Sequence, residues 1–79
     1  MILQIITPET TIYNGEIQNV TLPGTLGLFE VLENHAPIIS SLTKGKISYV
    51  LPSGEQNEIE TKNGGFVEVS QNIVSVCIE

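Results

Sequence analysis

Three residue types are missing from this sequence of 79 residues, which has no tryptophan, no aspartate and no arginine. Three lysines stand against nine glutamates, so the formal net charge is −6. Surfaces that bind nucleic acids or anionic membranes need clustered Lys or Arg, and Lys44 and Lys46 are the only close pair of cations. The composition therefore disfavours nucleic acid and anionic membranes as partners, and it favours a partner with complementary basic patches.

Long apolar runs are missing too. No run approaches the ~20 residues that a membrane-spanning helix needs, which argues against direct membrane insertion. Residues 1–5 lack the basic region of a signal peptide and resemble a strand that starts at once. The length fits one domain, residues 1–79.

Residues that could carry out chemistry are scarce. Cys77 is the single cysteine, so no internal disulfide is expected, and its apolar surroundings predict a small buried side chain in the last strand. His35 is the single histidine, no serine lies in a nucleophile elbow, and zinc would need three or four ligands. No phosphate-binding loop is present. We therefore expect no catalytic residue, no metal site, no cofactor and no small-molecule substrate.

Turn signals are what the sequence does contain, and they recur at short, fairly even intervals. Examples are Asn14-Gly15, Pro23-Gly24, Ser53-Gly54 and Gln71-Asn72, the last two of which are predicted to close hairpins. The residues between the turns are rich in Ile, Val, Thr and Tyr, which pack well in sheets. The pattern predicts an all-β sandwich or barrel.

Several strands can be predicted individually. Ile47, Tyr49 and Leu51 alternate with more polar residues, as do Val67 and Val69, which predicts that these side chains face a core. The three glutamates of residues 55–60 predict an edge strand, because charge there blocks association between sheet edges.

Two segments break the simple alternation. The three-residue step from Ile17 to Val20 predicts a β-bulge near Gln18 and Asn19. Apolar residues between 28 and 35 also fit one face of a helix, but the segment is too short for a stable helix. We interpret residues 26–32 as a strand and residues 33–37 as a loop.

The most specific feature is the segment from Gly24 to Pro37, with the order G-x-x-G-x-F-x-V-L-x-N-H-A-P. This order resembles a signature of the epsilon subunit of F-type ATP synthases, which is called delta in mitochondria. The similarity extends over the whole chain in the family's order and spacing. It includes L-x-I-I-T-P-E-x-T in residues 3–11 and G-G-F-x-E-V-x-x-N-x-V-x-V in residues 64–76.

The resemblance implies a flattened two-sheet antiparallel β-sandwich of about eight to ten short strands. It also implies a non-catalytic rotor subunit in the central stalk, which binds the gamma subunit and the ring of c subunits and couples ion translocation to ATP synthesis. Such a subunit would lie at the cytoplasmic face of the bacterial inner membrane as part of the ATP synthase.

The resemblance also assigns two surfaces. The expected gamma interface consists of Leu28, His35, Ala36, Pro37, Ile38, Ser40 and Leu42. The loop expected to face the c-ring consists of Pro23, Gly24, Thr25, Leu26 and Gly27. Thr25 stands where members of the family often have Glu or another polar residue. Backbone and apolar contacts are therefore expected to dominate there, and binding is expected to be only weakly salt-sensitive.

The sequence ends at Glu79, where the sandwich of the family ends, whereas relatives usually continue into a pair of α-helices. We therefore expect a short form that couples constitutively, without an ATP-responsive switch of its own. The alternatives are a free-standing β-sandwich binding module, for instance for carbohydrate, and a small acidic protein that mimics nucleic acid.

Overall fold

The computed structural model describes residues 1–79 and contains nine strands and no helix. No element of it is a helix that could cross a membrane. In chain order the strands are β1 Ile2–Ile6, β2 Thr11–Glu16, β3 Asn19–Gly24, β4 Gly27–Val31, β5 Ile38–Leu42, β6 Gly45–Val50, β7 Gln56–Thr61, β8 Gly65–Ser70 and β9 Ile73–Ile78.

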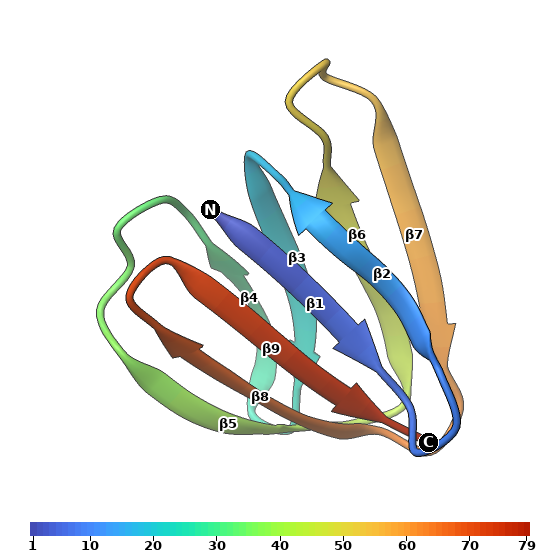
Figure 1. Ribbon diagram of the computed structural model, residues 1–79. Coiled ribbons are helices and arrows are strands. Elements are labelled where there is room, and N and C mark those ends of the chain that lie inside the picture. Colours follow the sequence, from blue (N-terminus) through green and yellow to red (C-terminus); the bar gives the residue numbers. More distant parts are fainter.

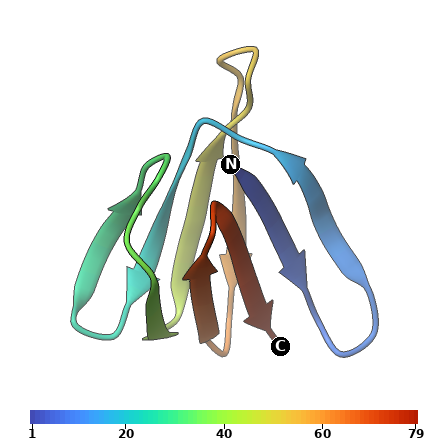
Figure 2. The same ribbon diagram turned by 60° about the vertical axis from the view of Figure 1, so that its left-hand side comes forward.

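The strands form one continuous sheet that curls into two facing layers (Figures 1 and 2). One layer has the order β2-β1-β9-β8-β5, and the other has the order β4-β3-β6-β7. The layers are joined where Gly24 of β3 pairs with Leu42 of β5. The predicted all-β sandwich is confirmed, and the strand count lies within the predicted range.

One pairing departs from the antiparallel prediction. Strands β1 and β9 run parallel, with Ile2 opposite Ile73 and Ile6 opposite Cys77, while all other paired strands are antiparallel. Local patterns could not indicate this pairing, because it joins the first strand of the chain to the last.

The core lies between the layers and receives alternate side chains from the strands. Predicted inward residues such as Ile47, Tyr49, Val67 and Val69 are buried, while Leu51 packs against the core from a half-buried position. The fully buried apolar side chains are Leu3, Ile5, Val20, Leu22, Val31, Ile47, Val67, Val69, Val74 and Val76. Both predicted hairpins are present, and β7 is the predicted edge strand.

The predicted bulge near Gln18 and Asn19 is wrong, because the chain changes layers there. Strand β2 ends at Glu16 and β3 begins at Asn19. Between them the Ile17 N–H donates to the Met1 carbonyl in one layer, and the Gln18 N–H donates to the Val50 carbonyl in the other. The three-residue step in the sequence therefore marks a crossing, in which Ile17 stays buried.

The prediction for Cys77 is also wrong. Val74, Val76 and Ile78 of β9 face the core, so Cys77 faces outward and is half exposed. On the outer face it lies between Phe66 of β8 and Ile6 of β1. An apolar run does not reveal the phase of its alternation, which explains the error.

We predict that Gly65→Ala destabilises the protein far more than Gly54→Ala. Both glycines have positive φ, 156° and 94°, where a side chain is strained. A Cβ at Gly65 would also overlap the Cys77 carbonyl oxygen, whereas a Cβ at Gly54 meets nothing within 4 Å. Urea unfolding should give a loss of about 1–2 kcal/mol for Gly54→Ala and about 2 kcal/mol more for Gly65→Ala. Equal losses would contradict the close approach of β8 to β9.

Candidate functional site

The β4–β5 loop, residues 32–37, lies at the end of the sandwich that also holds the N-terminus and the β8–β9 turn (Figure 1). It has no regular structure, as predicted. The His35 N–H donates to the Leu32 carbonyl over 3.2 Å, and the His35 ring Nδ1 lies 2.7 Å from the Ala36 carbonyl oxygen. His35 is half-buried, while Ala36 and Pro37 are exposed. The loop therefore presents His35, Ala36 and Pro37 on a compact turn.

The β3–β4 turn lies at the opposite end of the sandwich (Figures 1 and 2). Pro23 and Gly24 are buried, so the accessible residues are Thr25, Leu26 and Gly27. The Leu26 side chain is fully exposed. The turn is attached to β5, because the Thr25 N–H donates to the Ser41 carbonyl and the two side-chain hydroxyls lie 2.9 Å apart.

Two lysines flank the β3–β4 turn. Lys44 and Lys46 line a hollow of about 470 Å³ that also contains Gly24, Gly27 and Leu28. Lys46 pairs with Glu58 over 3.6 Å, and both side chains are exposed, so this pair adds little stability. The sequence alone did not place these lysines beside the turn, because their adjacency to it arises from the β3–β6 pairing.

Strand β5 alternates in a phase that sequence reasoning missed. Leu42 faces the core and is 5% exposed, whereas Ile39 on the outer face is 77% exposed. Ile38 and Ser40 lie on the same side of the strand as Leu42 and are half-buried. The Leu42 side chain, expected at the gamma interface, is therefore buried in the core, and Ile39 is the exposed apolar side chain of β5.

Four large apolar side chains are exposed in and next to β4 and β5, and four others, Ile6, Ile12, Phe66 and Ile73, are exposed on β1, β2, β8 and β9. Leu26, Leu28 and Leu32 lie in and around β4, and Ile39 lies on β5. Strand β4 is an edge of its layer, and β5 pairs with the other layer only at Gly24. Both strands lie on the same side in Figures 1 and 2. Apolar side chains gathered on one side of a small protein mark a candidate interaction surface.

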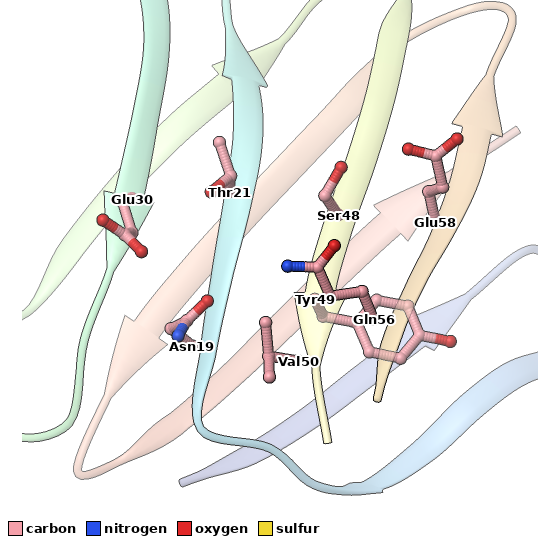
Figure 3. A pocket seen from close by; sticks show the side chains of 8 residues that line it. All are labelled: Asn19, Thr21, Glu30, Ser48, Tyr49, Val50, Gln56 and Glu58. Carbon is pink, nitrogen blue, oxygen red and sulfur yellow. The ribbon is translucent and has the colours of Figure 1, made fainter. Parts of the chain in front are cut away.

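A polar hollow of about 490 Å³ lies on the outer face of the second layer (Figure 3). The register places Glu30, Thr21, Ser48 and Glu58 in one row across four strands. Tyr49 lies against this hollow and is largely buried, and burial, together with the smaller effect of Tyr13, raises its pKa above the usual value. Among these residues Glu58 alone has an ion-pair partner, Lys46. The hollow offers hydrogen-bonding groups on an open sheet face.

No group of three or more His, Cys, Asp and Glu side chains is close enough to hold a metal ion. The structure places most of the expected residues at two ends of the sandwich, on the β4–β5 loop with β5 and on the β3–β4 turn. Leu28 is the exception, because it was expected at the gamma interface but directly follows the turn and lines the hollow beside the lysines.

Comparison with known proteins identifies similar chains. The model of the ATP synthase delta/epsilon chain β-sandwich domain matches residues 1–79. The ATP synthase epsilon chain of Nitratiruptor sp. is 42% identical over 77 residues, which cover 98% of this chain and 59% of that one. The epsilon chain of Chlorobaculum tepidum is 41% identical over 70 residues, which cover 89% and 78%. The chain spans only 59% of the length of the first relatives it matches.

Two solved structures have the same fold. A chain in the Euglena gracilis mitochondrial ATP synthase, in an assembly of OSCP, F1 and c-ring, superposes with a TM-score of 0.92 at 20% identity. That match covers 99% of this chain and 49% of the other. A chain in the central stalk and c-ring of the Tetrahymena thermophila enzyme superposes with a TM-score of 0.83 at 16% identity, covering 98% and 61%.

We predict that the exposed leucines contribute little to stability. Leu28→Ser should change the free energy of unfolding by about 0.5 kcal/mol or less, because the side chain is 74% exposed. Leu42→Ala should cost about 3 kcal/mol, because it leaves a cavity in the core. Denaturant unfolding of both variants measures the difference. A large loss for Leu28→Ser would mean that this residue serves the fold and not a contact.

Proposed function

The chain belongs to the β-sandwich family of ATP synthase delta and epsilon chains, and we propose that it is a central-stalk subunit of an F-type ATP synthase. The observation that supports this most strongly is the family match over residues 1–79. In the proposal the subunit is non-catalytic, binds the gamma subunit and the c-ring, and couples ion translocation to ATP synthesis. It works at the cytoplasmic face of a bacterial inner membrane.

The proposed gamma interface is the β4–β5 loop with the exposed apolar side chains next to it. His35, Ala36 and Pro37 supply the loop contacts, and Leu28 and Ile39 supply apolar area from β4 and β5. Ile38 and Ser40 are half-buried beneath this surface. These two side chains are 74% and 77% exposed, so their burial against a partner would stabilise the complex.

The proposed c-ring contact is the β3–β4 turn at the opposite end. Thr25, Leu26 and Gly27 are exposed there, and Pro23 and Gly24 support them from buried positions. Lys44 and Lys46 stand beside the turn, so this contact should weaken as salt concentration rises. Two contacts at opposite ends allow the sandwich to connect the ring to gamma.

The proposed mechanism is mechanical. The strands make 37 of the 46 backbone hydrogen bonds, which join them into one sheet, and the close-packed core resists shear between its layers. A stiff body of this kind transmits torque from a contact at one end to a contact at the other. Function then depends on complementary surfaces.

The alternative of a carbohydrate-binding module finds little support in the placement of the aromatic residues. Such a module needs exposed aromatic platforms. Tyr13 and Tyr49 pack against each other with ring centroids 4.8 Å apart, and Phe29 packs against the core. Phe66 is the only exposed aromatic side chain.

We predict that His35→Glu weakens binding to purified gamma subunit by about tenfold or more, because it places a charge in the centre of an apolar contact. Asn14→Glu is the matched control, because it adds the same negative charge far from the proposed interface. Asn14 is exposed and lies on the edge strand β2. Calorimetric titration of gamma should give nearly wild-type affinity for the control. Unchanged affinity of a folded His35→Glu variant would remove His35 from the interface.

We predict that a cysteine at Thr25 forms a cross-link with a cysteine in the polar loop of the c subunit in the assembled enzyme. Cys77 is half exposed and is first replaced by serine. A cysteine at Ser53, in the β6–β7 turn at the other end (Figure 1), is the control and should not react. If Ser53→Cys cross-links and Thr25→Cys does not, the proposed orientation is wrong.

A further inference from the structure

Two asparagines far apart in the chain hold the β4–β5 loop against the β8–β9 turn. The Asn34 backbone N–H donates to Asn72 Oδ1 over 2.7 Å. In return, Asn72 Nδ2 donates to Asn34 Oδ1 over 3.2 Å. The two bonds are reciprocal, and they attach the loop directly before His35.

The backbone of Asn72 is itself fixed. Its φ is 62° and that of Gln71 is 52°, as in the two-residue turns that close tight hairpins. The Asn72 carbonyl also accepts the N–H of Ile2 over 2.9 Å, which attaches the turn to β1. The side chain of Asn72 therefore starts from an anchored backbone, and its amide is a fixed partner for the loop.

On the β4–β5 loop, the backbone conformation of Asn34 also suits an asparagine. Asn34 has φ 63°, a conformation that asparagine tolerates better than most residues. The neighbouring Glu33 accepts a bond from the Met1 ammonium group over 3.1 Å, but its side chain is 63% exposed, so this ion pair holds the loop weakly. The asparagine bonds are also at the surface, but they attach the loop at the residue directly before His35.

We propose that Asn72 is a positioning residue for partner binding, acting through Asn34 to hold His35, Ala36 and Pro37 in the conformation that the partner recognises. The inference rests on the proposed function in one respect, because the partner is taken to be the gamma subunit. Asn72 itself lies in a turn outside the proposed contact surface.

The expected effect follows from a population argument. A loop that is held in its binding conformation needs no ordering on association, and the apparent affinity falls in proportion to the population of that conformation. Loss of two hydrogen bonds, each with a modest net contribution, should lower affinity by roughly tenfold. A merely structural role of Asn72 would lower stability without this selective effect.

The test uses three variants of the full chain. Asn72→Gly removes the side chain and keeps the positive φ of the turn. Gln71→Gly is the matched control, because it places a glycine in the same turn at a residue whose side chain makes no hydrogen bond. Asn72→Asp is the rescue variant, since its carboxylate accepts the Asn34 N–H and, after an amide flip of Asn34, a second bond.

Two readouts are measured. One is the solvent-exchange rate of the Asn34 backbone amide by NMR in the protein alone, and the other is the affinity for purified gamma by calorimetry. Asn72→Gly should speed the exchange and weaken binding by roughly tenfold, while Gln71→Gly and Asn72→Asp should stay within about twofold of wild type.

The two readouts separate failure of this inference from failure of the proposed function. If wild-type protein does not bind gamma, the proposed function fails, and the exchange rates still decide whether Asn72 holds the loop. If wild type binds and Asn72→Gly binds as well as Gln71→Gly, the positioning role is wrong. Weaker binding of Asn72→Gly with unchanged Asn34 exchange would also overturn it, because the effect would not pass through the loop.

Discussion

Burial of apolar side chains between two layers is the constraint on which the rest of this structure depends. A chain of 79 residues has a large surface for its volume, so nearly every strand must contribute to one shared core. The sheet achieves this by curling over. The layers are connected at two places, at Ile17, where the chain crosses from one layer to the other, and at Gly24, which pairs with both β4 and β5. The packing of the chain itself therefore determines both connections, independently of any partner.

Because the core uses only the inward-facing side chains, the outer surfaces can differ from one another in charge and polarity. The loops gather at two ends, and the outer faces and edges carry residues that the core does not need. Leucines and an isoleucine along β4 and β5 remain exposed, whereas the edge strand β7 carries glutamates. The β7 edge is thus protected against association by charge, whereas the side formed by β4 and β5 remains suited to association.

Local patterns in the sequence were sufficient for much of the fold. Alternation, turn residues and the glutamates of β7 predicted the all-β class, both hairpins and an edge strand, and the resemblance to a family predicted the two-layer form. These patterns could not predict which side chains of an apolar strand face the core, or which strands distant in sequence pair with each other. The outward direction of Cys77 and Ile39, and the layer change at Ile17, depend on which neighbours each strand meets. The loop contact between Asn34 and Asn72 was hidden for the same reason.

The parallel pairing of β1 with β9 has a consequence for the order in which the protein can form. During synthesis β1 emerges before the other eight strands, yet one of its two neighbours, β9, is made after all of them. Until β9 leaves the ribosome, β1 has only β2 beside it, and its other edge is open to wrong partners. The layer can close only after β9 has been made, so its formation is limited by contacts distant in sequence.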